Sequence, residues 1–199
     1  YAVSVGTDGK FTGAITFLGY PLFFKETCIH KVYGSIPSNY NLQTTICRGV
    51  QEGSEKSLAI VAETLYYKSR MDVCAYDGSL PQSVSAQFGT QTFTDAVGGS
   101  FETKYYISMK DSAASWHLFV FDTARGIWHR EDATQVMAFA NVRGDFLFID
   151  AATKKLHSAT GKTGTLETSV TWSATSGIMG YEYPDAKYLS RFNILAKLG

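Results

Sequence analysis

Thr64-Leu65-Tyr66-Tyr67-Lys68-Ser69 is one of four short aromatic segments that occur along the 199-residue chain. The other three are Pro21-Leu22-Phe23-Phe24-Lys25-Glu26, Lys104-Tyr105-Tyr106-Ile107-Ser108-Met109 and Asp145-Phe146-Leu147-Phe148-Ile149-Asp150. Their equivalent positions Leu22, Leu65, Tyr105 and Phe146 follow one another at steps of 43, 40 and 41 residues. One propeller blade needs about 40 residues for its four short strands and their turns. The repeat therefore predicts an all-β, β-propeller-like array of about four four-stranded antiparallel blades.

The same repeat predicts how the chain is divided. We expect a single propeller-like domain over residues 1–199, with blades at residues 12–50, 56–93, 98–133 and 134–180. Terminal strands at residues 1–6 and 187–198 are expected to pair and close a ring, which removes exposed strand edges. Because the chain begins with Tyr1 and has no secretory signal pattern, we expect it to be a piece of a longer protein.

Each repeat has the order expected of a meander. A short apolar strand comes first, at residues 14–18, 58–61 and 136–140, and the aromatic segment follows it. A third strand is predicted at residues 28–33, 73–77 and 117–122. After the last of these, Asp122, Gly126 and Trp128 resemble the outer hairpin of kelch-like blades. In that interpretation Trp128 packs on the neighbouring blade.

The composition excludes several classes of partner. Charged residues make up 18% of the chain, and the formal net charge is zero, so we predict no nucleic-acid specificity. No apolar run approaches the roughly 20 residues of a membrane span, and no membrane association is expected. The three cysteines form no Cys-x-x-Cys pair, which argues against zinc and favours buried thiols in a reducing compartment.

The sequence offers no complete catalytic constellation. It has no Gly-x-Ser-x-Gly elbow, and Cys74 lies within an apolar strand, where burial is the favoured interpretation. His117 and His129 flank one predicted hairpin, but two histidines fall short of the three ligands of a catalytic zinc. The carboxylates are scattered, and three have predicted turn-forming roles, namely Asp77, Asp122 and Asp150. We predict no catalytic residue, no metal and no cofactor.

Some aromatic residues lie outside the repeat register. Most of the aromatic side chains are expected to alternate into the cores of the strands. Aromatic residues elsewhere are better candidates for contacts with a sugar or a protein. The candidate partner-binding residues are Tyr40, Trp172, Tyr181 and Tyr183.

Several phrases of the chain resemble a family of virion structural proteins from tailed bacteriophages and prophages. The resemblance extends clearly from residue 3 to about residue 133 and more loosely to the end. The phrases that carry it are residues 22–34, 47–51, 65–70, 75–81, 104–109 and 128–132. Proteins of this kind are similar in plan to the propeller-like hub or nozzle proteins of the tail, beneath the head-tail connector.

The resemblance implies a non-enzymatic assembly platform. It implies synthesis in the bacterial cytoplasm, a place in the virion, and a ring whose partners are other virion subunits and further copies of the chain. Two other functions stay open. The first is a stand-alone propeller that binds a glycan or a protein, motivated by the four aromatic candidates. The second is a carboxylate-dependent glycoside hydrolase, which requires two carboxylates converging in one pocket.

Overall fold

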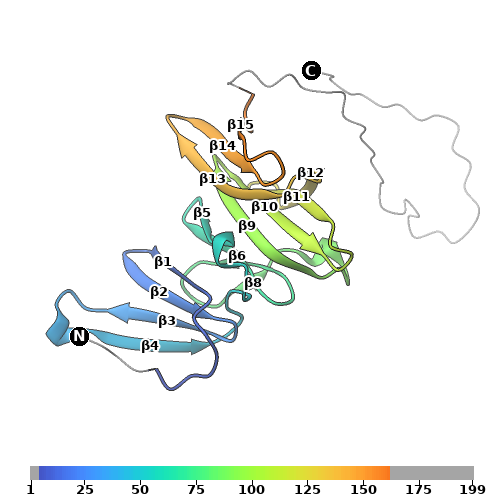
Figure 1. The fold of residues 1–199 in the computed structure, drawn as a ribbon. Helices are drawn as coiled ribbons and strands as arrows, with labels where there is room; N and C mark the ends of the chain where they lie inside the picture. The colour runs from blue at the N-terminus through green and yellow to red at the C-terminus, as the bar shows by residue number, and fades with distance from the viewer. Residues whose placement is uncertain (1–4, 162–199) are drawn as a thin grey trace, which may run out of the picture. The chain divides into compact units, whose positions relative to one another are not determined.

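A computed structural model describes residues 5–161 of the chain. Within this part the protein is all-β, as predicted, and its strands form four antiparallel sheets in chain order (Figure 1). Sheet 1 contains β1 (Gly13–Phe17), β2 (Tyr20–Lys25), β3 (Cys28–Tyr33) and β4 (Asn41–Ile46). Sheet 2 contains β5 (Ala59–Val61), β6 (Thr64–Lys68), β7 (Val73–Tyr76) and β8 (Gln82–Ser83). Sheet 3 contains β9 (Phe93–Phe101), β10 (Lys104–Asp111), β11 (Trp116–Asp122) and β12 (Ile127–Asp132). Sheet 4 contains β13 (Val136–Val142), β14 (Asp145–Asp150) and β15 (Leu156–Ser158).

The remaining elements are single turns of 3-10 helix between strands. They are η1 (Pro37–Asn39), η2 (Glu55–Ser57) and η3 (Ala86–Phe88). No helix within residues 5–161 has the length and apolar character needed to cross a membrane.

All four aromatic segments form the second strand of a sheet, namely β2, β6, β10 and β14. In each sheet a two-residue loop joins the first strand to the second, as in β5 and β6, where Val61 pairs with Thr64. Ala62 and Glu63 both have positive φ, which matches the right-handed twist of the flanking strands. The 40-residue repeat is therefore a repeat of one local unit, a tight hairpin continued as a meander.

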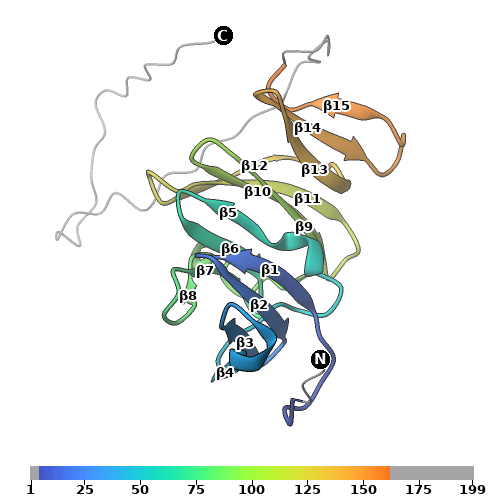
Figure 2. The same cartoon turned by 90° about the vertical axis from the view of Figure 1, so that its left-hand side faces the viewer.

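Neighbouring sheets pack face to face through the aromatic segments (Figure 2). In β6, Leu65 and Tyr67 point into a core shared with sheet 1, whereas Tyr66 points into a core shared with sheet 3. The ring pairs that join successive sheets are Phe24–Tyr67, Tyr66–Tyr105 and Tyr106–Phe146, with centroids 5.3, 5.3 and 4.7 Å apart. A sheet covered on both faces needs large apolar residues at consecutive positions, which explains the paired aromatics.

Two glycines of β9 allow this close packing on both faces of sheet 3. A Cβ atom at Gly98 would lie 2.5 Å from the Ser57 carbonyl oxygen of η2. A Cβ atom at Gly99 would lie 2.5 Å from Phe139 of β13. Since successive side chains of a strand point to opposite faces, the pair lets sheet 3 approach both of its neighbours.

The hydrogen bonds confirm the prediction for Trp128. Its indole Nε1 donates to the Val84 carbonyl oxygen at 2.7 Å, directly after β8 of the neighbouring sheet. Its ring also stacks on Phe121 of its own sheet, with centroids 4.8 Å apart, and contacts Phe88. The outer strand β12 is therefore tied to the preceding sheet as well as to its own.

Several boundaries differ from the expected ones. β9 begins at Phe93, a residue assigned from the sequence to the preceding blade, and Asp95 with positive φ lies within it. Sheet 4 has three strands within the described residues rather than four. Val5 and Gly6 lie outside any strand, while the rest of the predicted terminal strands falls outside residues 5–161. No strand of sheet 1 pairs with a strand of sheet 4 in the described part of the chain.

Candidate functional site

The structure describes one of the four predicted partner-binding aromatics, Tyr40. Tyr40 follows η1 at the entrance to β4, and its side chain is 42% exposed. Trp172, Tyr181 and Tyr183 lie outside the described residues.

Tyr40 belongs to an exposed apolar surface that sequence reasoning did not identify. Residues 11–46 carry many of the large apolar side chains that remain exposed on the described part of the chain. They are Phe11, Leu18, Tyr20, Phe23, Ile36, Tyr40 and Ile46. We call this set the sheet 1 surface. Phe11 packs on Phe23, and Phe23 and Ile46 share the face of sheet 1 that points away from sheet 2, so exposed apolar side chains on this face indicate a contact with another molecule.

The turn-forming roles predicted for three carboxylates are confirmed. Asp77, Asp122 and Asp150 each accept a backbone N–H from the residue two positions later, at 2.9, 3.1 and 2.9 Å. Side-chain hydrogen bonds in the same turns hold the pKa of each carboxyl below its usual value, and the donors are Ser79, Arg125 and Thr153 respectively. A general acid requires a raised pKa near the working pH. These three groups have the opposite shift.

Another group of carboxylates lines a cavity of about 330 Å³ beside sheet 1, together with Lys10. They are Asp8, Glu26 and Glu52. The Lys10 amine pairs with Glu52 at 3.0 Å, and the Glu26 carboxylate accepts the backbone N–H of Glu52 at 3.1 Å. Two of the three carboxylates therefore hold the loop that joins sheets 1 and 2.

Two of the histidines pair with carboxylates of their own strands or hairpins. The His117 Nε2 lies 2.7 Å from Asp111, and the His129 Nε2 lies 2.9 Å from Glu131. His30 is buried and lies 2.8 Å from the Thr44 hydroxyl, and burial lowers its pKa, with a smaller contribution from the Lys25 charge. Within residues 5–161 no group of three or more His, Cys, Asp or Glu side chains is placed to hold a metal ion.

The three cysteines are free thiols. Cys28 and Cys74 are buried, as predicted, and Cys47 is half-buried. Burial raises the pKa of Cys74 to about 12, and burial followed by the nearby Cys28 raises that of Cys47 to about 11. Because the thiolate is the nucleophile, these shifts oppose reactivity near neutral pH.

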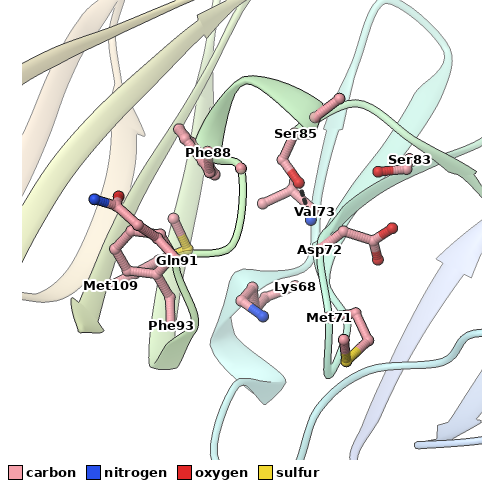
Figure 3. Close-up of a pocket in the computed structure, with 12 residues that line it drawn as sticks. Lys68, Met71, Asp72, Val73, Ser83, Ser85, Phe88, Gln91, Phe93 and Met109 are labelled. Carbon is pink, nitrogen blue, oxygen red and sulfur yellow. Dashed lines mark hydrogen bonds between the residues drawn. The ribbon is translucent and has the colours of Figure 1, made fainter. Parts of the chain in front are cut away.

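A cavity of about 220 Å³ lies between sheets 2 and 3 and has a buried lysine in its wall (Figure 3). Lys68 ends β6 and is 2% exposed. Met71, Asp72 and Val73 follow it around the hairpin, and Ser83 and Ser85 come from the end of sheet 2. The opposite wall is mainly apolar and is formed by Ala86, Phe88, Gly89, Gln91, Phe93 and Met109.

The charges in this cavity are not balanced one against one. The Asp72 carboxylate pairs with the Arg48 guanidinium and accepts a hydrogen bond from the Ser69 hydroxyl. Burial would raise the pKa of Asp72, but hydrogen bonds from Ser69, Ser83 and Cys74 and the Arg48 charge bring it below its usual value. The Lys68 amine donates to the Ser69 carbonyl oxygen, and none of the ion pairs within residues 5–161 includes it.

The environment of Lys68 makes its charge costly. Burial lowers the pKa of the amine to about 8, whereas the charge of Asp72 acts in the opposite direction. Sequence reasoning missed this residue because it lies inside an aromatic segment assigned to packing. A signal was present, since a lysine at the end of an apolar strand occurs twice, as Lys25 and Lys68 at equivalent positions of the repeat.

Comparisons with known proteins place the chain in no family: no family description matches it, and no curated protein is similar to it.

Proposed function

We propose that the chain is a non-enzymatic structural protein of a tailed-phage or prophage virion, where it acts as an assembly platform similar to a tail hub or nozzle. The phrases that resemble such proteins, from residue 3 to about residue 133, motivate this assignment. The structural observation that carries it is the covering of sheets 2 and 3 on both faces by their neighbours. Side chains that fill these faces build a scaffold, and contacts with partners are left to loops, edges and the outermost faces.

The junctions between sheets support a rigid platform. The Tyr105 hydroxyl donates to the Ser57 carbonyl oxygen at 2.7 Å, and the Ala96 backbone N–H donates to the Ser54 hydroxyl at 3.0 Å. Both serines are fully buried in the loop between sheets 1 and 2. Hydrogen bonds between buried groups fix the position of one sheet against the next more narrowly than apolar contact does.

The sheet 1 surface suits an assembly contact. A ring of identical subunits requires that one surface of each copy meet a different surface of the next. Phe11 and Ile46 are 57% and 74% exposed, and such large apolar side chains are stabilised when a neighbouring subunit covers them. The proposed partners are other virion subunits and further copies of the chain.

The thiols and the turn carboxylates of the described residues give little support to an enzyme. The pKa values of the Cys47 and Cys74 thiols and of the three turn carboxylates move away from the values that a nucleophile or a general acid needs. Two of the three carboxylates beside Lys10, Glu52 and Glu26, are engaged in an ion pair and a backbone hydrogen bond respectively. These observations favour the structural role over a glycoside hydrolase.

The composition of purified particles tests the proposal. Particles released from the parent bacterium are purified on a density gradient, and their proteins are identified by mass spectrometry. The protein should co-purify with the particles at a constant ratio to the major tail proteins, and cryo-electron microscopy should place it in the tail. Particles that are complete and infectious without the protein would overturn the assignment.

A pair of variants tests the sheet 1 surface within the same experiment. Ile46→Asp should reduce incorporation into particles, because it places a charge in the proposed contact. Leu80→Asp is the matched control, since Leu80 is an exposed leucine outside the sheet 1 surface. Equal incorporation of both variants would remove the sheet 1 surface from the proposal while leaving the virion assignment to the particle composition.

A further inference from the structure

We propose that the cavity between sheets 2 and 3 binds a small organic anion, a carboxylate carried on a compact apolar body, with the carboxylate at Lys68 and the apolar body against Phe88, Phe93 and Met109. The proposal rests on the geometry of the cavity and is independent of the virion assignment. The scaffold itself then contains a ligand site, in the cavity between sheets 2 and 3.

The positive charge of Lys68 is not compensated within the cavity. A buried ammonium group is stable only when it is paired or fully hydrogen-bonded. The Lys68 amine has three protons to donate, and the Ser69 carbonyl oxygen accepts from it. Asp72 is the nearest source of negative charge, but it already pairs with Arg48. Arg48, Asp72 and Lys68 together therefore carry one excess positive charge, which an anion in the cavity would neutralise.

The sheet 2 side of the cavity supplies a further hydrogen-bond donor. The Ser85 hydroxyl accepts the Val73 backbone N–H at 2.8 Å, so its own proton can be donated to a bound anion. The Ser83 hydroxyl also lines the cavity, but it already donates to Asp72. An ammonium with a hydroxyl donor on the same side of the cavity is a suitable environment for a carboxylate.

The opposite wall of the cavity is mainly apolar, and the cavity volume limits the size of the ligand. Phe88 and Phe93 contact each other with ring centroids 5.5 Å apart, and Met109 is fully buried behind them (Figure 3). These residues offer apolar surface, while the polar groups come from the sheet 2 side. Sites for drug-sized ligands occupy about 300–1,000 Å³. A cavity of about 220 Å³ therefore restricts the ligand to a small molecule.

The protonation of Lys68 sets the pH range of binding. Asp72 lines the cavity beside the amine and Arg48 pairs with Asp72, whereas the nearby Cys74 thiol is neutral in this pH range and the residues that line the cavity from sheet 3 are not ionisable. Because the pKa of the amine is lowered to about 8, the amine is mainly cationic at neutral pH. The anion should therefore bind most tightly at neutral pH or below and lose affinity as the amine deprotonates.

The test uses benzoate as the probe and the whole 199-residue chain. Calorimetric titration at neutral pH should give saturable binding to one site. Benzyl alcohol, which has the ring without the charge, and formate, which has the charge without the ring, should each bind at least about tenfold more weakly. No saturable binding of benzoate, or equal binding of benzyl alcohol, would overturn the proposal.

A matched pair of variants identifies the cation. Lys68→Met should lower the affinity for benzoate by about tenfold to a hundredfold, because the buried charge-assisted hydrogen bond is lost. Lys25→Met is the control, since Lys25 is a buried lysine at the equivalent position of the first repeat and lies outside the cavity. Affinity that is equal in the wild type and Lys68→Met would contradict the assignment of Lys68.

A measurement on the wild-type protein keeps the proposal testable even if a variant does not fold. Met71 and Met109 line the cavity, whereas Met137 lies on β13. With methyl-labelled methionine, benzoate should shift the NMR signals of Met71 and Met109 and leave that of Met137 unchanged. The shifts should disappear as the pH is raised well above the pKa of Lys68. Shifts of Met137 alone, or shifts that do not depend on pH, would place the ligand elsewhere and overturn the proposal.

Discussion

The boundary between sheets 2 and 3 and the boundary between sheets 3 and 4 use the same strand in different ways. At the first, aromatic stacking of Tyr66 on Tyr105 is combined with hydrogen bonds from Tyr105 and Trp128 to backbone carbonyl groups. At the second, Phe101 and Phe146 stack with centroids 5.5 Å apart, and Tyr106 also packs on Phe146. The aromatic side chains of the first boundary therefore make hydrogen bonds to the neighbouring sheet, whereas those of the second pack on one another. The directed polar contact at the second boundary comes from the buried Ser108 hydroxyl, which donates to the Thr134 carbonyl oxygen at 2.8 Å and accepts the Val136 backbone N–H at 3.1 Å.

The difference teaches how one repeat can make two kinds of junction. Tyr105 and Tyr106 are consecutive, so they point to opposite faces of sheet 3. The hydroxyl of Tyr105 meets a buried backbone carbonyl, whereas the ring of Tyr106 meets another ring. Position in the repeat thus fixes which face a residue covers, and the neighbouring sheet decides what it contacts there.

The most severe way to break the first boundary is to fill the space at Gly98. In Gly98→Val the added side chain meets the Ser57 backbone carbonyl, which cannot turn away as a side chain could. We expect a loss of about 5 kcal/mol in the free energy of unfolding, or no folded protein, as for the largest overpacking effects. Urea denaturation followed by circular dichroism measures it. The control is Gly6→Val, where nothing lies within 4 Å, and a similar loss in both variants would remove the close approach as the cause.

The second boundary should be most sensitive at Phe146. This side chain is 1% exposed and contacts rings from both sheets 3 and 4. Phe146→Ala should reduce the free energy of unfolding by about 3–5 kcal/mol, because it removes buried apolar surface and leaves a cavity. Phe23→Ala, at a half-exposed aromatic of β2, should cost about 1 kcal/mol. A loss of unfolding free energy at Phe146 no larger than that at Phe23 would contradict the role of ring packing at the boundary between sheets 3 and 4.

A smaller change tests the Tyr105 hydrogen bond at the boundary between sheets 2 and 3. Tyr105→Phe removes only the hydroxyl and leaves the buried Ser57 carbonyl oxygen without this donor. The expected loss is about 1–3 kcal/mol, the cost of an unsatisfied buried polar group. Tyr33→Phe removes an exposed hydrogen bond to Gln43 and should change stability by less than about 0.5 kcal/mol. Chemical denaturation of the two variants gives the comparison, and equal losses would assign no special role to the Ser57 contact.

The smallest effect is a pH dependence confined to the boundary between sheets 2 and 3. The pKa of Lys68 is lowered from 10.5 to about 8 in the folded protein. Between these values the unfolded chain holds a proton that the folded chain has lost, so stability rises with pH, by at most about 1.4 kcal/mol per pH unit. Below the folded pKa both states hold the proton, so stability no longer changes with pH through Lys68.

The check is the difference in unfolding free energy between the wild type and Lys68→Met, measured from about pH 7 to about pH 9.5. The wild type should gain stability relative to the variant as the pH rises. Buried tyrosines such as Tyr66 have a raised pKa and lower stability at high pH, but they contribute equally to both proteins and cancel in the difference. Parallel curves for the two proteins would indicate that Lys68 titrates normally.

Much of the local structure could be predicted from the sequence. The four aromatic segments are second strands, the turn carboxylates accept backbone N–H groups, and Trp128 contacts the preceding sheet. These features depend on alternation over a few residues and on the chemistry of single turns, which are local properties of the chain. The residues that hold sheets together were missed where they lie between strands: Ser54 and Ser57 lie outside the predicted strands, but both are fully buried.

The sequence by itself determined an all-β chain built from a repeated meander, because the two-residue period and the tight turns are written into neighbouring residues. The tertiary structure alone decided that Gly98 faces a backbone carbonyl and that Lys68 borders a cavity instead of water. The physical reason is that burial and charge compensation depend on residues from other sheets. Lys25 and Lys68 occupy the same position of the repeat, and only their distant neighbours give Lys68 a place in the wall of a cavity.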